Sequence, residues 1–166
     1  MPPPLQKLKD LQNLLRHKKE TLSVAESCTG GKLSEWLTFL PGSSDFFKGG
    51  VVSYWTEIKE SFLQVDSKAI EEKGVVSEET ARLMAQGIKK LFKTDWSLSI
   101  TGFAGPPNKK KDEEVGKVVF ALCSPFAYQT SVRYFKGERE DIRNKATHFA
   151  LDFLLSELKN NQKEEL

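Results

Sequence analysis

The chain has 166 residues, of which 39% are hydrophobic and 29% are charged. This length suffices for one domain with a buried core and is too short for two domains of ordinary size. The formal net charge of +2 does not by itself indicate nucleic-acid binding, so no nucleic-acid partner is expected. No apolar run approaches the roughly 18 residues of a membrane span, and the N-terminus lacks the apolar segment of a secretory signal.

Two cysteines, Cys28 and Cys123, do not suggest a disulfide framework in a chain of this length. We therefore expect a soluble, cytoplasmic protein with no membrane association.

Helical and extended patterns alternate along the chain, with no internal repeat and no linker between domains. Leucines spaced three and four residues apart predict the first helix, and short β-rich runs predict the strands. In chain order, the predicted elements are a helix within 1–20, a strand at 21–27, a helix at 30–40, a strand at 46–55, helices at 56–63 and 77–92, strands at 96–103, 116–125 and 128–135, and a helix at 140–159. The polar stretch 160–166 is expected to fray.

This order of elements predicts the fold class. Helices both separate and follow the strands, so we expect a mixed sheet covered on both faces. The prediction is a single-domain α/β fold over residues 1–166, built as a three-layer α/β/α sandwich. Ligands of such folds bind at the carboxyl ends of strands, so the segments "ESCTGG", "SYWTEIK" and "TGFAGP" are the ones to examine.

The segment "ESCTGG" admits two interpretations. Ser27 or Thr29 could cap the following helix by accepting hydrogen bonds from its first turn, and the motif alone favours this. Alternatively, Ser27 is a nucleophile, while Thr29, Gly30 and Gly31 form a helix start that faces an oxyanion or a phosphate. Cys28 is a rival nucleophile, but neighbouring residues that leave a strand point in different directions, so we assign Cys28 to packing.

A serine nucleophile needs a base. His17 and His148 fall inside predicted helices and are assigned to the surface or to packing. Burial can lower the pKa of a lysine enough for it to accept a proton, and Lys59 follows the strand that ends in "SYW" by one helical turn. The alternative for Lys59 is an ordinary solvated lysine. Tyr54 either relays a proton and orients this lysine or is a half-buried aromatic residue of the strand.

Two further groups of residues are candidates for substrate binding. The turn "TGFAGP" offers backbone N–H groups, or is an ordinary turn after a strand. Arg139 and Arg143 lie on one face of the last helix and suit a phosphate or carboxylate, or else pair with glutamates at the surface. No group of His, Cys, Asp and Glu has metal-ligand spacing, so neither a metal nor another cofactor is expected. The candidate residues of the turn are Thr101, Gly102, Ala104 and Gly105.

Several stretches, taken together and in order, resemble the C-terminal domain of the competence/damage-inducible CinA proteins, the PncC-type family of nicotinamide-nucleotide amidases. The resemblance covers the chain from about residue 5 to residue 158 and suggests a homo-oligomer. Larger members of the family carry an additional N-terminal domain, so the chain looks like a stand-alone form. The matching stretches are "AESCTGG" (25–31), "GGVVSY" (49–54), "EIK" (57–59), "GVVSEETA" (74–81), "SITGFAGP" (99–106), "VGKVVFA" (115–121) and "GEREDIRNKATHFAL" (137–151).

The resemblance implies an α/β/α fold and hydrolysis of the carboxamide of nicotinamide mononucleotide to nicotinate mononucleotide and ammonia. In the implied mechanism, neutral Lys59, with Tyr54 as a possible relay, takes the proton of Ser27, whose Oγ attacks the carboxamide carbon. Backbone N–H groups near Gly30 and Gly31, or those of the "TGFAG" turn, would stabilise the oxyanion. Carried onto this sequence, the family's site residues are Ser27, Lys59, Tyr54, Thr101, Gly102 and, for the substrate phosphate, Arg139 and Arg143.

This sequence departs from the family pattern in three places. The loop "PNKKKDEEVG" (107–116) lacks the usual glycines, Thr56 replaces an asparagine, and "GER" replaces Gly-Asp-Arg. These departures leave two alternatives beside the amidase. One is a family member that binds a nucleotide and regulates without turnover, and the other is a phosphate-binding enzyme of another class that uses "CTGG" as an anion site.

Overall fold

The computed structural model describes residues 1–108 and 113–164 of the chain. All the predicted strands and helices are present in it. The elements are α1 (Leu5–Lys18), β1 (Leu22–Glu26), α2 (Lys32–Leu37), a short 3-10 helix (Ser43–Asp45), β2 (Phe47–Val52), α3 (Thr56–Leu63), α4 (Ser67–Lys73), α5 (Glu78–Phe92), β3 (Trp96–Gly102), β4 (Lys117–Cys123), β5 (Tyr128–Tyr134) and α6 (Arg139–Glu164).

Two differences from the sequence prediction concern helices. Helix α4 was not predicted, because none of its residues is buried and its sequence therefore lacks a helical apolar pattern. Its start is marked instead by Asp66, whose side chain accepts a hydrogen bond from the amide of Lys68. Helix α6 continues to Glu164, so most of the stretch 160–166 that was expected to fray is helical, and residues 165–166 lie outside the described residues.

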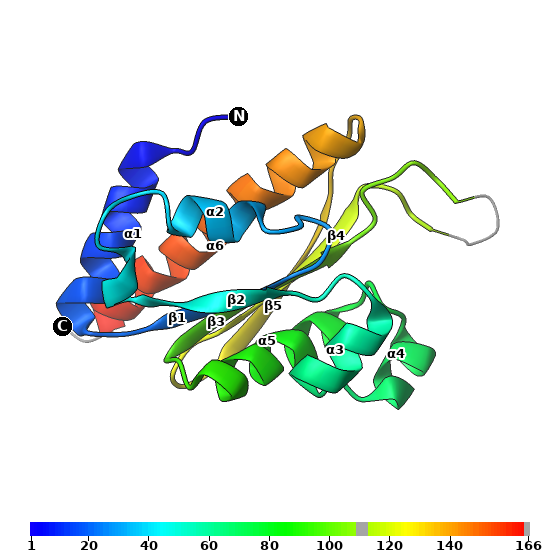
Figure 1. Cartoon of the computed structure of the whole chain (residues 1–166), viewed down its shortest axis with the longest axis horizontal. Helices are drawn as coiled ribbons and strands as arrows, with labels where there is room; N and C mark the ends of the chain where they lie inside the picture. The colour runs from blue at the N-terminus through cyan, green and yellow to red at the C-terminus, as the bar shows by residue number, and fades with distance from the viewer. Residues whose placement is uncertain (109–112, 165–166) are drawn as a thin grey trace.

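The five strands form one mixed sheet in the order β2-β1-β3-β4-β5. Strand β1 pairs in parallel with both β2 and β3, whereas β4 is antiparallel to β3 and to β5. Helices α1, α2 and α6 cover one face of the sheet, and α3, α4 and α5 cover the other (Figure 1). The predicted three-layer α/β/α architecture is therefore confirmed.

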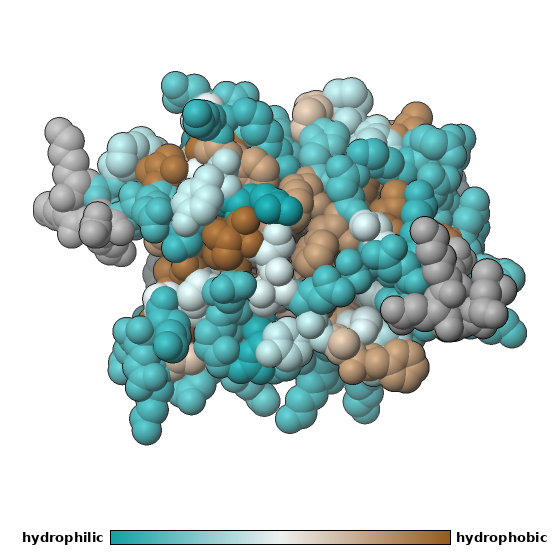
Figure 2. All heavy atoms as spheres, turned by 180° about the vertical axis from the view of Figure 1, so that it is seen from behind, coloured by the Kyte–Doolittle hydropathy of each residue, from teal (hydrophilic) through white to brown (hydrophobic). Residues whose placement is uncertain are grey.

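Buried apolar side chains fill the space between these layers. The larger cluster lies between the sheet and the helices α1, α2 and α6, and includes Leu15, Trp96 and Leu154. Two smaller clusters pack α5 against the opposite face of the sheet. On the face shown in Figure 2, hydrophilic residues surround a central patch of more hydrophobic ones. In the described part of the chain, no helix is long and apolar enough to cross a membrane.

The order of strands determines where a ligand can bind. Helix α2 connects β1 to β2 over one face, and α3, α4 and α5 connect β2 to β3 over the other. The chain leaves β1 toward β2 at one side of the sheet and leaves the neighbouring β3 toward β4 at the other. The crevice at the carboxyl ends of β1 and β3 is therefore the expected binding position. Ser27 follows β1 directly, and β3 ends at Gly102.

Candidate active site

Ser27 and Lys59 meet at the carboxyl ends of β1 and β2. The Nζ atom of Lys59 lies 3.1 Å from the Oγ atom of Ser27, and the carbonyl oxygens of Ser53 and Tyr54 lie 2.5 and 3.3 Å from the same Nζ. Only 1% of the surface of Lys59 and 8% of that of Ser27 are exposed. The sequence-based pairing of these two residues therefore corresponds to a direct contact in a buried position.

The end of β2 and the start of α3 direct Lys59 toward Ser27. The amide of Ser53 donates a 2.8 Å hydrogen bond to the carbonyl of Glu26, which holds the ends of β1 and β2 side by side. Trp55 is extended and precedes the first turn of α3, and the amide of Lys59 bonds to its carbonyl. Because helical side chains point back toward the N-terminus, the Lys59 side chain returns to the strand ends.

Burial changes the acid–base properties of the candidate base, Lys59, and of the rival nucleophile, Cys28. It lowers the pKa of Lys59 from 10.5 to about 8, so about a tenth of the amine is neutral at pH 7. A neutral amine can donate to the carbonyls of Ser53 and Tyr54 and keep its lone pair for the Ser27 hydroxyl. Burial raises the pKa of the Cys28 thiol to about 12, so this thiol stays protonated. Cys28 packs in the core, as predicted, but it also contributes to the lining of the cavity beside Ser27.

The cap of helix α2 comes from Glu26, a residue that the sequence analysis missed. Its fully buried carboxylate accepts hydrogen bonds from the hydroxyls of Thr29 and Ser34 and from the amides of Leu33 and Ser34. The interpretation of Ser27 or Thr29 as the helix cap is therefore wrong. A glutamate inside a short apolar strand was the available signal, because a buried carboxylate needs several donors.

The Thr29-Gly30-Gly31 segment forms the turn into α2 and does not line the cavity beside Ser27. Gly30 and Gly31 have φ values of 59° and 98°, a backbone region that favours glycine, and the Gly30 amide donates to the carbonyl of Ser27. The Thr29 hydroxyl donates to Glu26. The turn itself therefore accounts for the two glycines and for the Thr29 hydroxyl, and the expectation that these three residues face a bound anion stays a prediction.

A cavity of about 400 Å³ opens beside Ser27 and Lys59. The predicted turn after β3 lines it with Thr101, Gly102, Ala104 and Gly105, which places this turn across from Ser27 as expected. Other parts of the wall are apolar (Val75, Val76 and Phe103), polar (Thr56, Asn108 and Glu113) or positively charged (Arg139). Of the loop whose sequence departs from the family pattern, residues 109–112 lie outside the described residues, and Asn108 and Glu113 reach the cavity.

Tyr54 also lines the cavity, but its phenol does not lie between Ser27 and Lys59. Its phenol oxygen accepts a 2.8 Å hydrogen bond from Arg139, and its backbone carbonyl is the part that contacts Lys59. Because Ser27 and Lys59 are in direct contact, the Tyr54 phenol does not relay a proton between them. Tyr54 instead connects the lysine to the arginine at the cavity wall.

The two arginines at the start of α6 have different surroundings. Arg139 lines the cavity and donates to the Tyr54 phenol and to the Gly105 carbonyl. Arg143 lies beneath the nucleophile turn, where Nε donates to the carbonyl of Cys28 (3.0 Å) and Nη2 donates to that of Thr29 (3.2 Å). Of the two arginines only Arg139 belongs to the cavity lining, and the expectation that both bind one phosphate stays a prediction.

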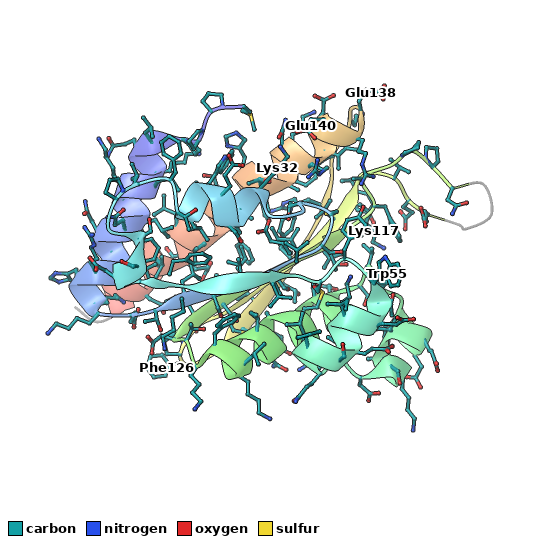
Figure 3. The ribbon with its side chains drawn as sticks, in the orientation of Figure 1. Lys32, Trp55, Lys117, Phe126, Glu138 and Glu140 are labelled. Atoms are coloured by element: carbon teal, nitrogen blue, oxygen red, sulfur yellow. The ribbon has the colours of Figure 1, made fainter. Side chains whose placement is uncertain are left out.

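Ion pairs of Glu140 join α2 to the start of α6. Glu140 accepts from Lys32 at 2.6 Å and from Arg143 at 2.9 Å, and Figure 3 shows Lys32 and Glu140 on their two helices. These bonds lower the pKa of Glu140, with the Lys32 contact contributing most. Glu140 thus connects α6 to α2 and also holds Arg143, whose guanidinium donates to the carbonyls of the nucleophile turn.

The described residues contain no group of three or more His, Cys, Asp and Glu side chains that could hold a metal ion. His148 packs edge-on against Trp36, with ring centroids 4.6 Å apart, and lies outside the cavity lining. The reactive groups that the structure places together at this site are the Ser27 hydroxyl and the buried amine of Lys59.

Comparison with known proteins decides the family. The CinA C-terminal domain model matches residues 5–158. The chain belongs to this family. A CinA-like protein of Syntrophomonas wolfei is 48% identical over 139 residues, which are 84% of this chain and 33% of that protein. A CinA-like protein of a Synechocystis species is 43% identical over 151 residues, 89% of this chain and 36% of that protein. The chain thus spans about a third of the length of these curated CinA relatives.

Solved CinA structures share the fold. The competence or damage-inducible protein of Enterobacter asburiae is 34% identical, with a TM-score of 0.90 over 95% of this chain and 99% of that one. A CinA superfamily protein of Escherichia coli is 31% identical, with a TM-score of 0.85 over 93% of this chain and 92% of that one. The resemblance inferred from the ordered motifs is therefore confirmed at the level of family and fold.

Proposed function

We propose that this CinA-family chain hydrolyses the carboxamide of nicotinamide mononucleotide, producing nicotinate mononucleotide and ammonia. The observation that carries the proposal is the 3.1 Å contact between Ser27 Oγ and the buried amine of Lys59 at the wall of a cavity. A serine next to a base of lowered pKa is the arrangement that nucleophilic acyl transfer requires.

The reaction begins when neutral Lys59 accepts the proton of Ser27 and Oγ attacks the carboxamide carbon. Lys59 then returns this proton to the leaving nitrogen, the C–N bond breaks, and ammonia departs. Lys59 next removes a proton from water, which attacks the acyl-enzyme, and the proton returns to Ser27 as the acid leaves. The carbonyls of Ser53 and Tyr54 fix the direction of the lysine lone pair throughout.

Backbone amides after β3 are the donors that we assign to the oxyanion. The amides of Leu33 and Ser34 at the start of α2 donate to Glu26, and the Phe103 amide donates to Lys117. Among the residues with described positions, none accepts a hydrogen bond from the amides of Ala104 or Gly105, which belong to the cavity wall. Loss of one oxyanion donor typically costs about 10²–10³ in rate.

The cavity has the size and surfaces for a mononucleotide. Its volume of about 400 Å³ falls within the range of small-molecule sites. Val75, Val76 and Phe103 offer an apolar surface for the pyridine ring, and Arg139 offers a guanidinium for the phosphate. Asn108 and Glu113 can accept hydrogen bonds from ribose hydroxyls.

Two substitutions test the proposal directly. We expect Ser27→Ala and Lys59→Met to lower the release of ammonia and nicotinate mononucleotide by about 10³-fold or more, because each removes one member of a cooperating pair. Matched controls are Ser61→Ala, an exposed serine of α3, and Lys68→Met, an exposed lysine of α4, which should retain the wild-type rate.

A wild-type rate in Ser27→Ala would contradict the proposal. If the wild type binds the nucleotide but releases no ammonia, and neither substitution changes binding, the result would favour a regulatory domain without turnover. Isothermal calorimetry with the mononucleotide, beside a coupled ammonia assay, separates these outcomes.

A further inference from the structure

Glu26 is a fully buried acid whose every acceptor position is used by the nucleophile turn and the first turn of α2. One carboxylate oxygen accepts from the Thr29 hydroxyl at 2.7 Å and from the Leu33 amide at 3.0 Å. The other accepts from the Ser34 amide at 3.0 Å and from the Ser34 hydroxyl at 2.6 Å. All four partners are donors, which matches a carboxylate that acts only as an acceptor.

This arrangement replaces an ordinary helix cap. The residue at the cap position, Gly31, has no side chain that could accept from the first turn of α2. Caps are usually Ser, Thr, Asp or Asn, and Ser27 and Thr29 are the nearby residues of that kind. Because the Glu26 carboxylate already occupies the free amides, the Ser27 hydroxyl is left to bond with Lys59.

The main chain of Glu26 is connected, through Ser53, to Lys59, the second member of the Ser27–Lys59 pair. Its carbonyl accepts from the Ser53 amide at 2.8 Å and from the Ser53 hydroxyl at 3.3 Å. The carbonyl of Ser53 in turn accepts from the Lys59 amine. One residue thus connects the turn that carries Ser27 with the strand end that orients Lys59.

We propose that Glu26 is a positioning residue that holds the Ser27 hydroxyl in line with the Lys59 amine. The assignment rests on the proposed amidase function for its kinetic part. Glu26 does not line the cavity, so its side chain acts through the Thr29 and α2 contacts and not through the substrate. Substitutions at Glu26 should therefore change kcat and leave KM nearly unchanged.

The variant Glu26→Gln tests the carboxylate alone, because it replaces that group and keeps the length of the side chain. The carbonyl oxygen of the new side chain can still accept from Thr29 and Leu33, but its NH₂ group cannot accept from the Ser34 amide. The backbone bonds to Ser53 are unaffected. Glu35→Gln is the matched control, because Glu35 belongs to the first turn of the same helix, is exposed, and loses the same charge.

Two measurements are made on each variant. The first is steady-state hydrolysis of nicotinamide mononucleotide, and the second is the rate of covalent labelling of Ser27 by a fluorophosphonate, followed by mass spectrometry. For Glu26→Gln we expect kcat and the labelling rate to fall by about 10²-fold, since a small displacement of the nucleophile has an effect of this size, with KM within about twofold of wild type. Glu35→Gln should match the wild type in both measurements.

Thermal unfolding separates positioning from stability. If Glu26→Gln lowers the melting temperature but labels Ser27 at the wild-type rate, Glu26 only stabilises the fold and the proposal is overturned. Ser34→Ala keeps the carboxylate and removes one donor, so it covers the case in which Glu26→Gln does not fold. We expect slower labelling than wild type in Ser34→Ala, and a wild-type rate there would also overturn the proposal.

The labelling experiment does not depend on the substrate. If the wild type releases no ammonia while its Ser27 is labelled rapidly, the amidase proposal fails, and the comparison of labelling rates still tests Glu26. If the wild type is not labelled at all, both proposals are contradicted.

Discussion

Lys59 lies with its amine between the ends of two strands, and its environment differs from that of the exposed lysines of this chain. Burial lowers its pKa to about 8, and two backbone carbonyls accept hydrogen bonds from the amine. Near neutral pH, both protonation states are populated, and only the neutral state can accept the Ser27 proton. The rate of the proposed reaction should therefore follow the titration of this single group.

The pH dependence of hydrolysis tests this role. We expect kcat/KM to increase about tenfold per pH unit well below the Lys59 pKa of about 8 and to level off above it, because deprotonation creates the active base. Lys68→Met, which changes an exposed lysine, should retain this profile. A rate that is constant between pH 6 and pH 9 would show that Lys59 is not the titrating base.

At the level of single residues, the sequence was informative where the chemistry has few alternatives. A serine at a strand end needs a base, the histidines are badly placed, and this elimination led to Lys59, which contacts Ser27. The sequence did not separate Arg139 from Arg143, because helical spacing shows that two residues share a face but not what that face contacts. A glutamate in a short apolar strand was the one signal for Glu26, and its role was missed because two of its four donors are backbone amides, which have no signature in the sequence.

Among the elements, helix α6 contributes two arginines to the candidate active site, one from each of its first two turns. Arg139 reaches the cavity, the Tyr54 phenol and the Gly105 carbonyl. Arg143 donates to the carbonyls of Cys28 and Thr29 and is mostly shielded from solvent. One helix terminus therefore supplies both a group that can meet substrate and a group that fixes the nucleophile turn.

Paired substitutions distinguish these two contributions. We expect Arg139→Ala to raise KM about tenfold with little change in stability, because an exposed charge–phosphate contact is lost. We expect Arg143→Ala to lower the free energy of unfolding by about 1–3 kcal/mol, because two backbone carbonyls lose charged donors, with a smaller change in KM. Steady-state kinetics and urea denaturation of both variants provide the test. An Arg143→Ala variant with normal stability and a raised KM would place Arg143 in the binding site.

The boundaries of elements were predictable only where apolar periodicity extends to the end of the element. Helix α5 matches its predicted range closely because one of its faces is buried along its length. Helix α2 was expected to begin at Gly30, but it starts at Lys32, because the two glycines adopt positive φ in the preceding turn. Helix α4 has no buried face and could be recognised only from its Asp66 cap and the glycine that ends it.

For the whole molecule, the order of helices and strands was enough to predict three layers and a site at the carboxyl ends of the strands. The parallel arrangement of β1, β2 and β3 brings the ends of these strands to one edge of the sheet, so Ser27, Lys59 and the turn after β3 meet there. The assignment of helices to faces was not available from the sequence, since it depends on the handedness of each crossover and on the order of the strands.

The buried amine at this edge also affects the stability of the whole fold. In the unfolded chain Lys59 has a pKa of 10.5, and in the folded chain its pKa is about 8, so between these values the unfolded state binds more protons. The free energy of unfolding should therefore rise with pH across this interval.

Comparison with Lys59→Met isolates this effect, because the titrations of all other groups are common to both proteins. We expect the free energy of unfolding of the wild type, relative to that of Lys59→Met, to increase by about 2–3 kcal/mol between pH 7 and pH 10. Urea denaturation at several pH values measures the difference, and Lys68→Met, which changes an exposed lysine, should show no such trend relative to the wild type. A constant difference between wild type and Lys59→Met would mean that the folded state does not depress the pKa of this amine, and the neutral base of the proposed mechanism would then lack support.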